Sequence, residues 1–208
     1  FLVDLASTGK AIHKGESIQP DTALQKPKAA PINLEGIVKD KALTVLILPN
    51  DRFSVRLLDI TKYLTENYQA LCYVNLNKLH QTLSRNLEKN KINQNKILFI
   101  DGISKTINKD IKEPRNCLCV TSPSSLSELG IVIGKALKTK KFDAFVFNSL
   151  STLLVYNPPT QVRQFVHKLA SMLSEGGMTG VFTLVEGDKN TRLIKEIGLY
   201  ADKVTELK

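Results

Sequence analysis

The sequence is poor in the residues that build disulfide networks, metal modules and membrane spans. Its 208 residues include three cysteines, two methionines and no tryptophan, which excludes a dense disulfide framework. Its cysteines and histidines lack the paired spacing of zinc modules. The longest clear apolar run covers residues 43–48, far short of the roughly 20 residues of a membrane helix. The remaining composition, 42% hydrophobic and 24% charged, is typical of a soluble globular protein.

Acidic residues are outnumbered by basic ones, and the formal net charge is +9. Residues 1–40 carry five lysines and five acidic residues, so the whole excess lies in 41–208. Lys138, Lys140 and Lys141 form the only tight basic run of the sequence, and aromatic residues do not interleave with it. We interpret the charge as a solvated basic surface. The alternative is a nucleic-acid contact through these three lysines.

Two segments with different patterns divide the chain. Residues 6–33 hold few large apolar side chains and are punctuated by prolines, so 1–40 is predicted to be an N-terminal arm or linker. From residue 41 onward, short apolar runs alternate with helical stripes. The expected strands cover 43–48, 71–74, 97–100, 117–120, 142–147, 180–185 and 204–207, and a polar loop is expected at 103–114. The alternation predicts an α/β domain over 41–208 with a doubly wound, mostly parallel sheet and helices on both faces.

In such a sheet, ligands bind beyond the carboxyl ends of the strands. Polar residues follow most of the expected strands, so we expect candidate site residues at these positions. They are Asn50-Asp51-Arg52, residues 75–78, Asp101, Thr121-Ser122, Asn148-Ser149 and Glu186.

Two stretches carry a family resemblance. The first is ALCYVNLNK at 70–78, followed by an amphipathic helix and NKILFIDGIS. The second is FVFNSLSTLL at 145–154. Together they resemble the RecA-like ATPases, and most of all the KaiC-like branch of archaea and bacteria. In the KaiC-like proteins, the strand equivalent to the first stretch ends in a threonine, an apolar residue and a pair of glutamates. The strand equivalent to the second stretch is the Walker B strand, in which an apolar run is followed by Asp, Ser and a small apolar turn. The likeness covers roughly 41–208. It implies a RecA-like core, an archaeal cytoplasmic protein, and self-association through the sheet edge and flanking arms.

The parts that hydrolyse ATP in that family are replaced here. The loop after the first strand is Pro49-Asn50-Asp51-Arg52-Phe53-Ser54, with no glycine and no Gly-Lys-Ser/Thr to wrap phosphates and Mg²⁺. Asn77 and Lys78 stand at the glutamate pair, and Asn148 stands at the Walker B aspartate. An amide cannot orient an attacking water as a carboxylate does. We therefore expect no ATPase activity, no cofactor and no metal. The vestigial positions are Asn50, Asp51, Arg52, Ser54, Asn77, Lys78, Asn148 and Ser149.

Other chemistry-bearing residues have simpler interpretations. Cys117 and Cys119 are two residues apart on a strand, so their side chains point to the same face. They could form a metal-binding or redox pair, or they could be two small core residues, and we favour the second interpretation. His80 and His167 have no nucleophile or carboxylate near them in sequence and are interpreted as ordinary histidines. Asp101 follows a strand as a receiver-domain phospho-acceptor does, but a second acid beside Asp51 is missing.

The hypothesis that follows is a non-catalytic RecA/KaiC-like domain that serves as a protein-interaction, scaffold or regulatory module. Its expected partner is another copy or another protein. One alternative is nucleic-acid binding by the basic surface of 41–208. Another is nucleotide binding without hydrolysis through Arg52, Ser54 and Asn148.

Overall fold

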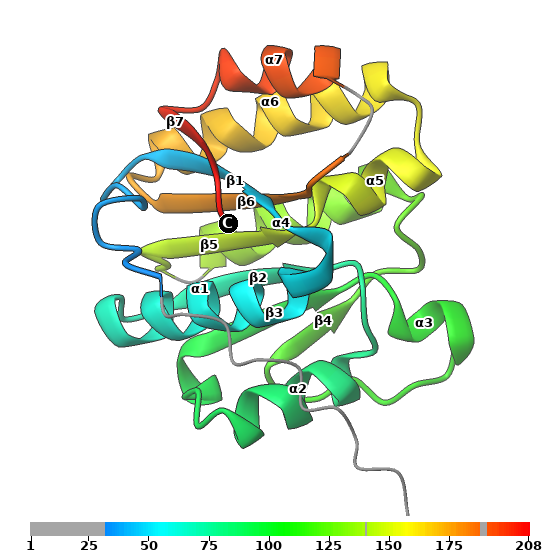
Figure 1. Cartoon of the computed structure of the whole chain (residues 1–208). Helices are drawn as coiled ribbons and strands as arrows, with labels where there is room; N and C mark the ends of the chain where they lie inside the picture. Colours follow the sequence, from blue (N-terminus) through cyan, green and yellow to red (C-terminus); the bar gives the residue numbers. More distant parts are fainter. Residues whose placement is uncertain (1–31, 140, 188–190) are drawn as a thin grey trace, which may run out of the picture.

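A parallel sheet forms the centre of the molecule (Figure 1). The computed structural model describes residues 32–139, 141–187 and 191–208, so the predictions for 1–31 and Lys140 lie outside the described residues. Within them, seven strands pair in the order β4-β3-β2-β5-β6-β1-β7, and every neighbouring pair is parallel. The predicted doubly wound α/β fold is confirmed. The strands are β1 (Leu43–Leu48), β2 (Leu71–Asn75), β3 (Ile97–Asp101), β4 (Cys117–Cys119), β5 (Ala144–Asn148), β6 (Thr179–Val185) and β7 (Lys203–Glu206).

Helices cover both faces of the sheet because its strands are apolar on both sides. One face packs against α1 (Phe53–Asn67) and α2 (His80–Lys89). The other packs against α4 (Leu126–Thr139), α5 (Leu150–Tyr156), α6 (Pro159–Glu175) and α7 (Thr191–Gly198). Short turns complete the described chain: η1 (Asn50–Arg52), η2 (Gln94–Lys96) and α3 (Ser104–Ile107).

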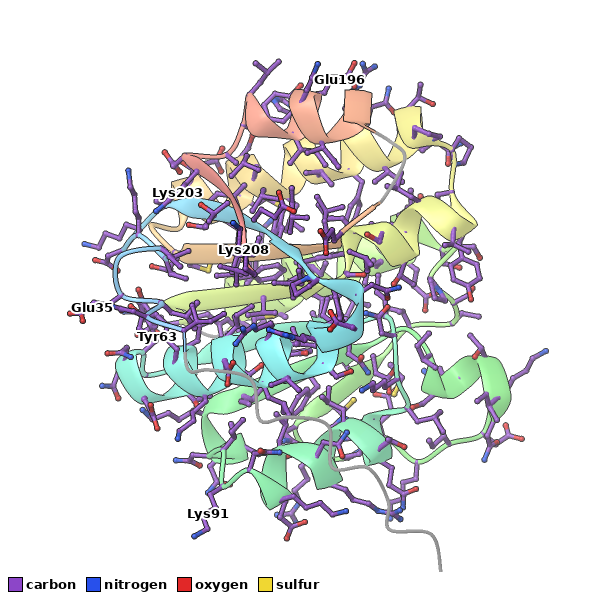
Figure 2. All side chains as sticks on the ribbon, viewed as in Figure 1. Glu35, Tyr63, Lys91, Glu196, Lys203 and Lys208 are labelled. Atoms are coloured by element: carbon purple, nitrogen blue, oxygen red, sulfur yellow. The ribbon has the colours of Figure 1, made fainter. Side chains whose placement is uncertain are left out.

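Strand alternation assigns each buried side chain to one of two cores. In β2, Leu71 and Tyr73 face α1 and α2, whereas Cys72 and Val74 face α4 to α6. Residues before β1 add to the first core, because Leu34 and Val38 are buried in it. Lys203 of β7 holds this segment by donating to the Gly36 carbonyl at 2.9 Å; Figure 2 labels Lys203 at this edge of the molecule. Packing on the α1 face therefore begins at least as early as Leu34.

Two short helices were not predicted from the sequence, and side-chain capping explains both. The predicted polar loop at 103–114 contains the short helix α3, because the Asp101 carboxylate accepts the backbone N–H groups of Ile103 (2.7 Å) and Ser104 (3.1 Å) and so begins the turn. No element was predicted directly after Asn148, where the structure has the helix α5. Ser149 caps α5 by accepting from the Thr152 N–H at 3.4 Å, a typical N-cap contact.

Among the described residues, none of the helices is both long enough and apolar enough to cross a bilayer.

Candidate functional site

A row of polar residues crosses the carboxyl edge of the sheet. Asn148 of β5 is in register with Asn75 of β2, Asn75 with Asp101 of β3, and Asp101 with Cys119 of β4. All four residues are buried. Because they occupy equivalent positions of parallel strands, their side chains share the sheet face that α1 and α2 cover. The sequence indicated polar strand ends, and the strand order brings them into one line.

The connection from β1 to α1 is tight and helical. Pro49 leads into η1, and the Arg52 N–H donates to the Pro49 carbonyl at 3.2 Å. Asp51 and Arg52 form an exposed ion pair at 3.5 Å, and Asn50 is exposed beside them. A phosphate cradle needs a glycine-rich loop whose N–H groups point at the ligand. This connection has no glycine, and its Arg52 N–H is used internally.

The side chains at the ends of β2 and β5 bond to one another. Asn77 Nδ2 donates to Asn148 Oδ1 at 2.6 Å, and Thr152 Oγ1 donates to Asn77 Oδ1. Asn148 Nδ2 donates to the Tyr73 hydroxyl at 3.2 Å. Burial raises the pKa of Tyr73, so this hydroxyl is neutral at physiological pH. We call Asn77, Asn148, Ser149 and Thr152 the amide cluster. In this cluster, neutral side chains serve as hydrogen-bond partners for one another.

A second link joins β2 to the start of α1. Lys78 Nζ donates to Ser54 Oγ at 3.0 Å. Asn75 Nδ2 donates to the backbone carbonyl of Lys78 at 2.5 Å. Asn77 Nδ2 also donates to Ser149 Oγ at 3.4 Å. Of the eight predicted vestigial positions, hydrogen bonds therefore connect Asn77 with Asn148 and Ser149, and Lys78 with Ser54. The three residues of η1, Asn50, Asp51 and Arg52, are exposed to solvent. Lys138 and Lys141 lie elsewhere, exposed at and after the end of α4.

Asp101 organises the other end of the polar row. Besides the N–H groups of α3, its carboxylate accepts from the backbone N–H of His80 at 3.1 Å and from Ser104 Oγ at 2.5 Å. One buried carboxylate therefore fixes the first residues of both α2 and α3. This is a positioning role that the sequence did not reveal.

Two cysteines and a histidine surround this carboxylate. Potential ligand atoms of His80, Asp101 and Cys117 all lie within 4.8 Å of one another, and Cys117 Sγ lies 4.0 Å from Cys119 Sγ. Burial raises the pKa of both thiols and lowers the pKa of His80, although nearby Asp101 opposes the shift of the histidine. We call His80, Asp101, Cys117 and Cys119 the edge cluster. Sequence reasoning missed it because its members meet only through the β3–β4 register. The signal was the i, i+2 pair of cysteines.

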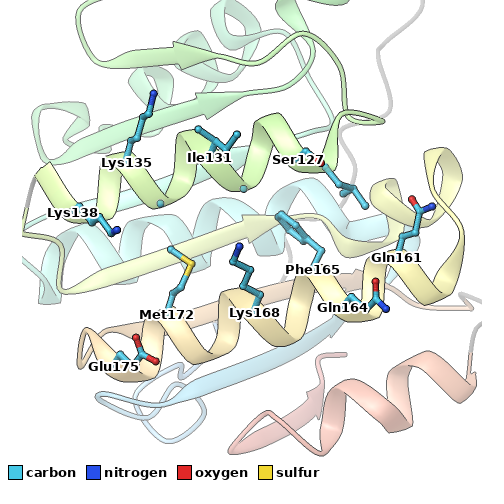
Figure 3. A pocket seen from close by; sticks show the side chains of 13 residues that line it. Ser127, Ile131, Lys135, Lys138, Gln161, Gln164, Phe165, Lys168, Met172 and Glu175 are labelled. Atoms are coloured by element: carbon cyan, nitrogen blue, oxygen red, sulfur yellow. The ribbon is translucent and has the colours of Figure 1, made fainter.

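A groove lies on the opposite side of the sheet, between α4 and α6, with a volume of about 1040 Å³. Gly130 and Gly134 leave space along α4, and Phe165 and Met172 rise toward it from α6 (Figure 3). Ile131 on its border is 57% exposed. The groove therefore presents apolar surface to solvent.

The border of the groove is mostly basic. Lys135 and Lys138 of α4 and Lys168 of α6 line it, against one acidic residue, Glu175. Figure 3 shows Lys168 pointing from α6 toward α4. A ligand for this surface would combine apolar groups with negative charge.

Comparison with known proteins agrees with the fold. The sequence profile of a family of unknown function, DUF7504, matches residues 104–207. Among solved structures, 230 chains are similar. One is a KaiC-like protein from the hyperthermophilic archaeon Pyrococcus horikoshii, with 17% identity, a TM-score of 0.58, and coverage of 84% of this chain and 75% of that one. This likeness supports a RecA-like core. A search of curated proteins finds no match.

Proposed function

The chain belongs to a family of unknown function (DUF7504), and we propose that it is a non-catalytic RecA-like domain that acts as a protein-interaction module. The open α4–α6 groove carries the proposal, because it combines apolar surface with a basic border. The amide cluster supports the non-catalytic part. Carboxylates that would orient water or Mg²⁺ are replaced by carboxamides bonded to each other and to Thr152.

The proposed occupant of the groove is an acidic amphipathic helix of a partner protein. The glycines of α4 allow close approach of a helix whose apolar face covers Phe165 and Met172, which is a common mode of peptide recognition. Acidic side chains on its flanks would meet Lys135, Lys138 and Lys168. The net charge of +9 disfavours a second copy of the chain, because like charges repel.

The test uses a labelled designed peptide with leucines on one helix face and glutamates on its flanks, followed by fluorescence anisotropy. The same peptide with lysines in place of glutamates is the charge control. We expect saturable binding of the acidic peptide alone. The double variant Lys138→Glu, Lys168→Glu should bind roughly tenfold more weakly, since border charges act mainly on association. The double variant Lys89→Glu, Lys112→Glu, which changes exposed lysines outside the groove, should bind like the parent.

A second variant tests the groove itself. Gly134→Leu introduces a Cβ 3.4 Å from Met172 Cε and fills the space. Leucine is also a better helix former than glycine, so we expect a folded protein that no longer binds the peptide. Unchanged binding would contradict the proposal. A concentration-dependent dimer that Gly134→Leu abolishes would assign the groove to a second copy instead.

Nucleic-acid binding is the second candidate, favoured by the three lysines that gather along the groove. Anisotropy with single- and double-stranded DNA over a salt series distinguishes it, because phosphate contacts weaken steeply with salt. The apolar floor favours a peptide, so we expect no DNA binding at about 50 mM salt. Tight binding that the lysine-to-glutamate variant removes would replace our proposal.

Calorimetry with ATP tests the non-catalytic part, with and without Mg²⁺. Lys78 is tied to Ser54, and the β1–α1 connection has no phosphate loop, so we expect no heat and no thermal shift up to millimolar ATP. A ligand that binds the native state would raise the unfolding temperature by mass action. Micromolar binding that Lys78→Ala and Arg52→Ala weaken would show that a nucleotide site persists.

A further inference from the structure

The edge cluster gathers metal-binding side chains from three separate elements. His80 begins α2, Asp101 ends β3, and Cys117 and Cys119 lie in β4. Phe99 and Asp101 are the register partners of Cys117 and Cys119. The alternating positions of both strands therefore point to the face that α2 covers. Imidazole, carboxylate and thiol atoms of His80, Asp101 and Cys117 lie within 4.8 Å of one another.

One polar atom in this cluster is left without a partner. His80 Nδ1 is buried and has no hydrogen-bond partner among the described residues. The ring packs edge-on against Phe99 with its centroid 4.8 Å away, which restricts the orientation of the imidazole. Buried polar groups are nearly always hydrogen-bonded, and an exception calls for an explanation such as an ion. Burial also lowers the pKa of His80, which keeps the imidazole in the neutral form that binds metals.

The donor set identifies the ion. Two thiols and an imidazole select zinc over magnesium or calcium, which prefer oxygen ligands. Two sulfur atoms about 2.3 Å from one tetrahedral zinc would lie close to 4 Å apart, and Cys117 Sγ and Cys119 Sγ are 4.0 Å apart. We propose that the edge cluster is a structural zinc site with His80 Nδ1, Cys117 Sγ and Cys119 Sγ as ligands and the Asp101 carboxylate as the fourth.

Zinc binding requires rearrangement at Cys119, whose Sγ lies outside the group formed by His80, Asp101 and Cys117, and a limited change around Asp101. Its two oxygens accept from four donors, and one of these is the Ser104 hydroxyl. Rotation of that hydroxyl frees a lone pair for the metal while the backbone N–H bonds to the carboxylate remain. Each thiol releases its proton to solvent on binding. The complex of Zn²⁺ with two thiolates and one carboxylate carries one negative charge. Lys105 lies beside it, donating to the Cys119 carbonyl at 3.1 Å.

The test is titration of the reduced, metal-free full chain, without an affinity tag, with Co²⁺ as a spectroscopic stand-in for zinc. Tetrahedral Co²⁺ bound by thiolates gives near-ultraviolet charge-transfer bands. We expect one equivalent to produce them and one equivalent of Zn²⁺ to remove them. Zn²⁺ should also raise the unfolding temperature, since the site forms in the native state. Failure of wild-type protein to give the bands would overturn the proposal.

Variants assign the ligands. Cys117→Ala, Cys119→Ala and His80→Gln should each weaken Co²⁺ binding by more than about 100-fold, beyond the effect of a residue outside the first coordination shell. Cys72→Ala is the matched control, because Cys72 is also a buried thiol but faces the opposite core. Circular dichroism checks that each variant is folded, and any one folded ligand variant decides the question. Bands that survive in that variant, or that disappear in Cys72→Ala, would contradict the assignment.

Discussion

The two ends of the polar row differ, although they share one sheet edge and one sheet face. At the β2–β5 end, the amide cluster consists of neutral groups that bond to one another. At the β3–β4 end, the edge cluster combines a carboxylate, two thiols and an imidazole whose Nδ1 is buried without a partner among the described residues. At the first end, the polar side chains find hydrogen-bond partners in one another, whereas at the second end the His80 Nδ1 atom finds none among the described residues. The fold class alone would have directed attention to the first.

The largest effect is expected from removing Asp101. The Asp101→Ala change leaves four donors near the starts of α2 and α3 without their acceptor. Each buried unsatisfied donor costs about 1–3 kcal/mol, partly relieved by water, so we expect the free energy of unfolding to fall by about 3 kcal/mol or more. Urea denaturation measures it. Asp51→Ala, which removes an exposed ion pair, should change stability by less than about 0.5 kcal/mol. A similar cost for both variants would show that Asp101 does not organise this end.

A smaller effect is expected in the amide cluster. Asn148 is 1% exposed and bonds to both Asn77 and Tyr73. Its replacement by alanine should lower the free energy of unfolding by about 1–3 kcal/mol. Asn77 is exposed, so water can replace its partners and Asn77→Ala should cost under about 1 kcal/mol. Urea denaturation of both variants tests whether burial decides the cost. If Asn148→Ala were neutral, the interpretation of this end as a self-contained network would be wrong.

The sequence predicted the fold well because its strands are short apolar runs that must be buried on both faces. Residues 43–48 and 97–100 show this pattern and became β1 and β3. The helix α5 was missed because its first turn depends on a side-chain cap by Ser149 rather than on a long apolar stripe. Asn77 and Asn148 were singled out together through a family resemblance. His80, Asp101 and Cys117 were each considered and set aside, because nothing in a linear sequence shows that β3 pairs with β4.

The smallest effect is expected from the titration of His80 in the metal-free protein. Burial lowers its pKa in the folded state, whereas the unfolded chain binds a proton near the ordinary value of about 6.5. The unfolded state therefore binds more protons in mildly acidic solution, and the stability contributed by neutral His80 is lost as the pH falls below about 6.5. Asp101 and Cys117 lie beside this imidazole, and the charge of Asp101 opposes the lowering of its pKa.

Urea midpoints at pH 7.5 and 5.5 in the presence of a chelator measure this effect. The midpoint should fall less for His80→Gln than for wild-type protein, because glutamine does not titrate. His167→Gln changes an exposed histidine whose ring contacts Tyr200 at a tilt and serves as the control for a histidine-to-glutamine change outside the edge cluster. An equal fall in wild-type protein and His80→Gln would mean that water reaches Nδ1 in solution. The contrast between a complete and an incomplete end of the polar row would then disappear.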